Sequence, residues 1–297
     1  MATELSRHSW PAVPLHPLVL VPLGSTEQHG PHLPFTTDTV IASAVAAGVA
    51  ARFAAGREAP GAAGAEGRVA PPAAGVVGSR GSPGTSAVGA EPAVVVAPAL
   101  GFGASGEHQS FAGTVSIGQE ALRFVLIELV RSLSTWAERV VFVNGHGGNV
   151  AALSSAVAQL VAEQHRVGWL PCSAPAEALA AAGLPAPDAH AGRTETSLML
   201  HLAPGTVRLP LPPAGATAPL SSLLPRLTAG GVAAVSPSGI LGDPTGANAA
   251  EGGRLLAAVV DEAVRLVVAG EPDARGMLRV PGRPPVSPEP TSAGEPV

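Results

Sequence analysis

The segment from Pro22 to Asp38, PLGSTEQHGPHLPFTTD, places several side chains that bind divalent metals within one short stretch. They are two carboxylates and two imidazoles, namely Glu27, His29, His32 and Asp38. Carboxylate and imidazole ligands together suit zinc, manganese or iron(II). An aspartate can also give one oxygen to each of two ions. We therefore take as a hypothesis that this segment forms half of a dinuclear metal site.

The spacing within the segment supports this hypothesis. Glu27 and His29 are two residues apart, so in an extended segment both side chains point to the same side. Prolines and glycines stiffen the segment, and stiff loops of this kind position functional groups. Taken alone, the pair could be a surface carboxylate and a loop histidine, and Asp38 or Thr37 could simply cap a helix.

The hexapeptide NGHGGN, residues 144–149, is the second candidate motif. Its glycines let the backbone turn sharply after a strand. A turn alone does not explain the histidine between them, so we predict that His146 is a metal ligand. Asn144 and Asn149 are expected to hold the turn or to cap the following helix.

The third motif, HAGRTETS, spans residues 190–197 and is expected to open a helix with Thr194 as its N-cap. Glu195 could then interact favourably with the helix dipole or act as a further metal ligand. A histidine is neutral near pH 7 unless its surroundings shift its pKa, which suits His190 to proton transfer.

A polar loop after the second predicted strand carries Glu107 and His108, which are either a solvated pair or substrate contacts. The same loop begins with GFGASG, residues 101–106, but no helix opens after it. A dinucleotide site is therefore not indicated.

Each polar motif follows an apolar run or opens a helix. Strands are predicted at 17–21, 93–99, 139–143 and 167–171, and helices at 39–53, 119–136, 150–164, 194–202 and 249–269, with 206–225 irregular. This alternation predicts a three-layer α/β/α fold with a mainly parallel central sheet. The motifs would then converge at the carboxyl edge of that sheet, where open α/β folds bind ligands.

Composition limits the possible partners and the extent of the domain. Of the 297 residues, 46% are hydrophobic and 13% charged, which is enough for one large core. Residues 56–92 and the tail 271–297 are rich in Pro, Gly and Ala, so we predict a single domain within 1–270, interrupted by a disordered insertion and followed by a disordered tail. A net charge of −5 and a pI near 6.0 argue against nucleic acid as a partner.

Cysteine usage and hydropathy bear on the compartment. The single Cys172 excludes an internal disulfide and fits a reducing compartment. We find neither a signal-peptide pattern nor an uninterrupted apolar run of about 18 residues. A cytoplasmic protein without a membrane partner is therefore expected.

The three motifs, together with GASGEHQSFAGT at 103–114 and SPSGILGDPTGA at 236–247, resemble those of the creatininase family of metal-dependent amidohydrolases. The resemblance covers nearly all of the predicted domain. It implies that Glu27 and His29 bind different ions and that Asp38 bridges them. It also implies that His146 is a ligand and that His190 transfers protons. Some relatives carry a glutamate where this chain has Gly148, so Glu195 is expected to complete the second site.

The resemblance further implies hydrolysis of an amide by water activated between two divalent ions, Zn, Fe(II) or Mn. Glu195 or His190 would carry the proton, and Glu107, His108, Gly147 and Gly148 would contact the substrate. Within the family the chain is most similar to the branch that acts on the modified precursor peptide of mycofactocin, releasing its C-terminal Val-Tyr dipeptide. Relatives also form homo-oligomers.

Two alternatives stay open from the sequence. The same site could hydrolyse a small cyclic amide or a formamide, as other members of the family do. The chain could also be a non-catalytic metal-binding subunit.

Overall fold

The computed structural model describes residues 4–58, 92–181 and 183–282, and a parallel four-stranded sheet lies at its centre. Its strands are β1 (Leu18–Leu23), β2 (Val94–Val96), β3 (Arg139–Asn144) and β4 (Val167–Pro171), in the order β2-β1-β3-β4. All six residues of β1 are buried, because parallel strands are covered on both faces. This explains why the strands are continuous apolar runs in the sequence.

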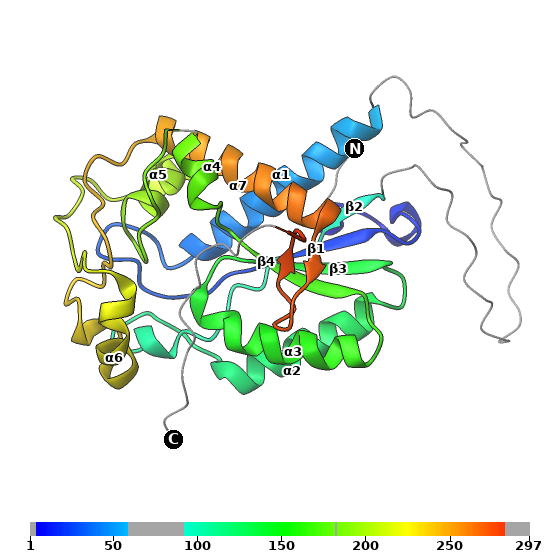
Figure 1. Ribbon diagram of the computed structural model, residues 1–297, viewed down its shortest axis with the longest axis horizontal. Coiled ribbons are helices and arrows are strands. Elements are labelled where there is room, and N and C mark those ends of the chain that lie inside the picture. Colours follow the sequence, from blue (N-terminus) through cyan, green and yellow to red (C-terminus); the bar gives the residue numbers. More distant parts are fainter. Residues whose placement is uncertain (1–3, 59–91, 182, 283–297) are drawn as a thin grey trace, which may run out of the picture.

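Helices cover both faces of the sheet (Figure 1). Leu18 and Leu20 of β1 pack in a core with residues of three helices, α1 (Thr37–Glu58), α5 (Arg193–Leu202) and α7 (Ala249–Ala269). Val19 and Val21 point to the opposite core, which includes α2 (Gly118–Leu133) and α3 (Val150–Ala162). The predicted three-layer α/β/α fold with a parallel sheet is confirmed.

Several segments differ from the prediction. The stretch 206–225, expected to be irregular, contains the start of α6 (Leu220–Gly230), and a further short helix, α4 (Ala176–Ala181), was not predicted. Single 3-10 turns lie at Leu5–Arg7, Trp10–Ala12, Gly106–His108, Gly147–Asn149, Pro204–Thr206 and Val232–Ala234. Because a proline inside a helix removes a hydrogen bond, Pro225 made the sequence of α6 resemble a loop.

The predicted start of the disordered tail at 271 is wrong. An antiparallel hairpin of β5 (Glu271–Pro272) and β6 (Leu278–Arg279) follows α7. Leu278 is buried, and the Trp169 indole Nε1 donates a hydrogen bond to the Arg275 carbonyl at 2.8 Å. The folded domain therefore extends beyond 270. Residues 283–297 and 59–91, where we predicted disorder, lie outside the described residues, whereas 56–58 belong to α1.

The register of the central strands brings the polar loops together. Leu23 at the end of β1 pairs with Asn144 at the end of β3, so the loops after both strands leave the sheet side by side. A Cβ added at Gly145 would lie 2.6 Å from the Asp38 carbonyl oxygen. Only glycine lets the loop after β3 approach the start of α1 this closely.

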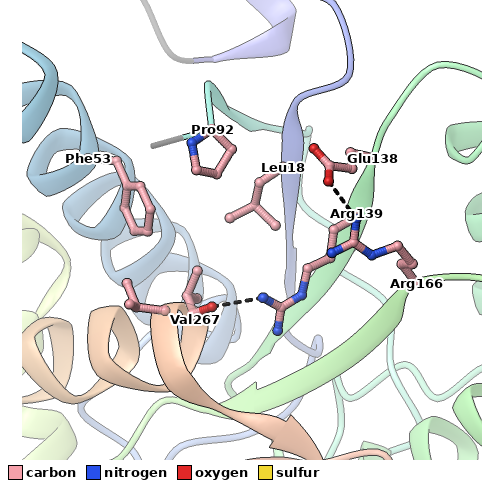
Figure 2. Close-up of a pocket in the computed structure, with 8 residues that line it drawn as sticks. Leu18, Phe53, Pro92, Glu138, Arg139, Arg166 and Val267 are labelled. Atoms are coloured by element: carbon pink, nitrogen blue, oxygen red, sulfur yellow. Dashed lines mark hydrogen bonds and ion pairs between the residues drawn. The ribbon is translucent and has the colours of Figure 1, made fainter. Parts of the chain in front are cut away.

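The opposite, amino edge of the sheet has a small cavity of about 200 Å3 (Figure 2). Leu18 and Phe53 form part of its apolar wall, and Arg139 donates a hydrogen bond to the Val267 carbonyl at 2.8 Å. Since Leu18 and Arg139 begin their strands, this cavity is separated from the polar loops by the length of the sheet.

Among the described helices, α1 is the one that is long and apolar enough, by length and composition, to cross a membrane. Its residues Ile41, Val45 and Val49 are buried in the core beside the sheet. These buried contacts are those of a core helix, and core helices commonly meet the same criterion of length and apolar composition.

Candidate metal centre

The loop after β1 carries charged and imidazole side chains into the interior of the protein. Glu27 and His29 are fully buried, and Asp38, at the start of α1, is 2% exposed. His146, from the loop after β3, is 6% exposed. Burying ionisable groups costs several kcal/mol unless they are paired or bind a metal. The cluster therefore needs a compensating partner.

These side chains form two triads that share Asp38. One triad is Glu27, Asp38 and His146, and the other is His29, Asp38 and Glu195. Within each triad the potential ligand atoms lie within 4.8 Å of one another. Asp38 turns Oδ1 toward His29 Nε2 at 2.9 Å and Oδ2 toward His146 Nδ1 at 3.6 Å. One carboxylate thus faces both groups, as a bridging ligand would.

The carboxylate of Glu27 shows most clearly that a cation fits here. Both of its oxygens are buried, and neither accepts a hydrogen bond. The nearest cationic candidates are His146 Nε2, 3.1 Å from Oε2, and His108 Nε2, 3.4 Å from Oε1. A buried carboxylate without donors is costly, and a divalent ion beside it would remove that cost. The donor set of carboxylates and imidazoles also fits zinc, manganese or iron(II).

The shifted pKa values of Glu27 and His29 show that the cluster favours positive charge. Burial raises the pKa of Glu27, but His146 and His108 outweigh that effect and hold the pKa well below its usual value. Burial lowers the pKa of His29, yet the charge and hydrogen bond of Asp38 bring it to about 10. An imidazole must be neutral to bind a metal, so a divalent ion would displace such protons.

His190 stands beside both triads. Its Nδ1 lies 3.8 Å from Glu27 Oε1, its ring centroid is 4.3 Å from that of His29, and its Nε2 donates a hydrogen bond to the Gln28 carbonyl at 2.8 Å. Burial and the neighbouring His29 and His108 hold the pKa of His190 well below its usual value. A neutral imidazole next to the presumed ion positions can accept a proton.

Glu195 lies in the first turn of α5, but the predicted N-cap of that helix is wrong. Gly192, not Thr194, is the N-cap residue, and glycine has no side chain that could cap the helix. Instead the Asp188 carboxylate accepts hydrogen bonds from the backbone amides of Arg193 at 2.8 Å and Thr194 at 3.0 Å. A carboxylate at this position satisfies free amide groups and complements the helix dipole.

The side chain of Glu195 is directed inward by its own loop. The Ala191 amide donates a hydrogen bond to Glu195 Oε2 at 2.6 Å, and this oxygen lies 3.9 Å from His29 Nε2. Burial and the negative charge of Asp38 raise the pKa of Glu195 to about 7.

His32 belongs to neither triad. It is hydrogen-bonded to the Thr196 hydroxyl at 2.8 Å, and this contact ties the first loop to α5.

Two asparagines hold the His146 loop in shape. Asn144 donates a hydrogen bond to the His146 carbonyl at 2.7 Å, and Asn149 accepts one from the Ala104 amide at 2.9 Å. Asn149 also donates to the Gly24 carbonyl at 3.1 Å, although its side chain does not cap α3. The predicted turn-holding role is confirmed for both residues.

The two glycines after His146 differ sharply in their surroundings. A Cβ at Gly148 would lie 2.3 Å from His146 Nε2 and 2.6 Å from Glu107 Oε1, whereas nothing lies within 4 Å of a Cβ at Gly147. Glu107 and His146 approach to 3.4 Å across this gap. Substrate contact by Glu107, His108, Gly147 and Gly148 stays a prediction.

We expect Gly148→Ala to weaken metal binding by about 10- to 100-fold, because the added methyl group would push the His146 ring from its position. Gly147→Ala is the matched control, since it adds the same methyl group to open space and should leave the affinity unchanged. Competition with a chromogenic chelator measures both variants. Equal affinities for the two would mean that the ring position at His146 does not govern metal binding.

Three residues that organise the site were not predicted as part of it. Ser25 donates a 2.5 Å hydrogen bond to Asp38 Oδ2, Asp188 fixes the start of α5, and Gln28 lies among His108, His190 and Gly239. In the sequence Gln28 stands between the predicted ligands Glu27 and His29, and this position was the one feature that could have indicated its role.

Comparisons with known proteins agree with this geometry. Residues 6–267 match the family described as creatininase, creatinine amidohydrolase. The mycofactocin precursor peptide peptidase of Mycobacterium tuberculosis is 49% identical over 262 residues, which are 88% of this chain and 89% of the relative.

Two solved structures share the fold at low sequence identity. A mutant creatininase of the Zn-Zn type is 21% identical with a TM-score of 0.62, covering 90% of this chain and 97% of the other. A manganese creatininase is 20% identical with a TM-score of 0.60, covering 90% of this chain and 98% of the other.

Proposed function

Because this chain belongs to the creatininase family of metal-dependent amidohydrolases, we propose that it releases the C-terminal Val-Tyr dipeptide from the modified mycofactocin precursor peptide. The observation that carries the proposal is that Asp38 belongs to two adjacent triads of potential ligands, in which every residue except the half-buried Glu195 is buried. The similarity to a peptidase over most of both chains supports a peptide as the substrate.

Two divalent ions would occupy the triads. One would be held by Glu27, Asp38 and His146, and the other by His29, Asp38 and Glu195. Zinc, iron(II) and manganese all suit these ligands. When bound, such a pair polarises an amide carbonyl and lowers the pKa of a water molecule to near neutrality.

His190 is the residue best placed to move a proton. Its Nε2 hydrogen is engaged by the Gln28 carbonyl at 2.8 Å, so Nδ1 is the nitrogen that accepts the proton and returns it to the leaving amide nitrogen. Glu195, with a pKa near 7, is the alternative carrier. A cation beside a carboxylate favours its ionised form, so Glu195 serves better as a ligand once the ions are bound.

Access for a peptide is expected beside the His146 loop. Gly147 is exposed and borders open space, and Glu107 is partly exposed beside it. His108 is buried on the inner side, with its Nε2 toward Glu27. These residues would contact the substrate around the scissile bond. A homo-oligomer and a cytoplasmic location stay predictions from the sequence.

Replacing His146 by Ala should remove one of two ions per chain and lower the hydrolysis rate by about 10³-fold or more, because several kcal/mol of stabilisation depend on that ion. Elemental analysis and a peptide assay on the same sample measure both effects. His165→Ala is the control, since His165 pairs with Glu163 near the surface, at 3.7 Å. Unchanged metal content with full turnover would reject His146 as a ligand.

The substrate is tested by mass spectrometry of the modified precursor peptide before and after incubation with the metal-loaded protein. Loss of the C-terminal dipeptide is expected, and prior treatment with a chelator should abolish it. Creatinine and a formamide are supplied in parallel reactions. Turnover of either one without cleavage of the peptide would favour a small-amide hydrolase, and no turnover of any amide would favour a metal-binding subunit.

A further inference from the structure

Gln28 lies between the proposed ligands Glu27 and His29, but its side chain points to a different set of partners. It is 5% exposed and contacts His108, Gly239 and the backbone of Gly30. We propose that Gln28 is a positioning residue that fixes His108 as a hydrogen-bond donor and His190 as a proton acceptor. This inference rests on the proposed function for its chemistry, but not for its geometry.

The orientation of the Gln28 amide follows from one unambiguous donor. The Gly30 backbone amide lies 2.8 Å from Gln28 Oε1, and a backbone amide can only donate. The other end of the side chain is therefore the NH₂ group. Its two hydrogens are directed to His108 Nδ1 at 2.8 Å and to the Gly239 carbonyl at 3.2 Å.

The tautomer of His108 follows from that orientation. Because Gln28 Nε2 can only donate, His108 Nδ1 must accept and carries no hydrogen. The hydrogen of the neutral ring is then on Nε2, which lies 3.4 Å from Glu27 Oε1 at the metal centre. His108 thus presents an N–H group to the site.

His190 also carries its ring hydrogen on Nε2, but it turns the other nitrogen, Nδ1, toward the metal centre. Its Nε2 lies 2.8 Å from the Gln28 backbone carbonyl, which can only accept, so the ring hydrogen is on Nε2. Gln28 Nε2 is also 3.1 Å away, but both of its hydrogens are already used. The free nitrogen of His190 is therefore Nδ1, 3.8 Å from Glu27 Oε1.

The fold makes special room for the Gln28 side chain. Gly239 has φ +80°, and a Cβ there would lie 1.9 Å from Gln28 Oε1 and 2.8 Å from Nε2. Any other residue at 239 would be strained and would displace the amide. Three separate loops, around residues 28, 108 and 239, therefore meet at this one side chain.

The result is a pair of neighbouring histidines with complementary roles. Their ring centroids are 4.5 Å apart, and one presents a donor where the other presents an acceptor. Amide hydrolysis needs a donor for the carbonyl oxygen and an acceptor for the proton of the attacking water. The Gln28 side chain fixes the donor on His108, and the Gln28 backbone carbonyl fixes the acceptor on His190.

The test is Gln28→Glu in the zinc-loaded enzyme. The introduced carboxylate has the same shape and still accepts from Gly30, but it has no hydrogen for His108 Nδ1. That nitrogen then takes up a hydrogen, which long-range ¹H–¹⁵N spectra of histidine-labelled protein detect directly. We expect kcat to fall by about 10²-fold, with melting temperature and zinc content unchanged. Gln28→Met, which makes no hydrogen bond, should also lower kcat.

Gln164→Glu is the matched control, because Gln164 is exposed just after α3, whose opposite end adjoins the His146 loop. Its kcat should be that of the wild type. A kcat for Gln28→Glu within about threefold of wild type would overturn the proposal, and so would loss of zinc in proportion to activity. A hydrogen already on His108 Nδ1 in the wild type would also overturn it. If the wild type cleaves no peptide, the proposed function fails while the spectra still decide the tautomers.

Discussion

Asp38→Asn is expected to remove both ions and to lower the hydrolysis rate by at least about 10³-fold. Asp38 belongs to both triads and turns one oxygen toward each histidine ligand. An asparagine of the same size keeps a single carbonyl oxygen and carries no charge. It therefore cannot bridge two cations.

Metal analysis after equilibrium dialysis, together with the peptide assay, measures this effect. Asp261→Asn makes the same chemical change at the surface, where Asp261 pairs with Arg52 at 2.8 Å, and should change neither quantity. Two ions per chain in Asp38→Asn would show that the triads do not share this carboxylate.

His190→Gln is expected to lower kcat by about 10²- to 10⁴-fold while both ions stay bound. His190 reaches the site with a free Nδ1, but the two triads that share Asp38 are complete without it. The amide of glutamine can form hydrogen bonds but does not accept a proton near neutral pH. The loss should therefore appear in kcat and not in metal content.

His201→Gln is the matched control for this variant, since His201 is exposed on α5. His190 also forms a third group with Glu27 and His29 that could itself hold an ion. A fall in metal content that parallels the loss of activity in His190→Gln would assign His190 as a ligand in place of a proton carrier.

Much of the site could be predicted because its chemistry is local in sequence. Glu27, His29 and His146 each lie a few residues after a buried strand, and parallel strands bring such loops to one edge. Glu195 required only that a helix begin near residue 193. Residue type and strand order predicted that these positions meet at one edge of the sheet, and the resemblance to the creatininase family implied their roles as ligands.

The parts that could not be predicted depend on contacts between distant loops. Gln28 has no ligand chemistry, and its role appears only when the loops around His108 and Gly239 surround it. Asp188 caps α5 from outside the helix, where the sequence offered Thr194 as a nearer candidate. Gln28 thus bonds to residues far away in the sequence, whereas Asp188 caps α5 from the loop just before the helix.

The errors in the fold have a similar origin. The hairpin that begins at Glu271 lies in a proline-rich sequence, and it is ordered because Leu278 packs against Gly168 of β4. Pro225 lies within α6 although proline disfavours helix interiors. Tertiary packing outweighs local propensity in both segments, and composition alone does not report it.

We propose that five side chains from three parts of the chain hold two cations on either side of Asp38. Anomalous diffraction from zinc-loaded crystals tests it directly. We predict two peaks about 3.5–4 Å apart, one in contact with Glu27, Asp38 and His146 and the other with His29, Asp38 and Glu195. A single peak, or peaks that do not contact Asp38, would show that Asp38 does not bridge two ions.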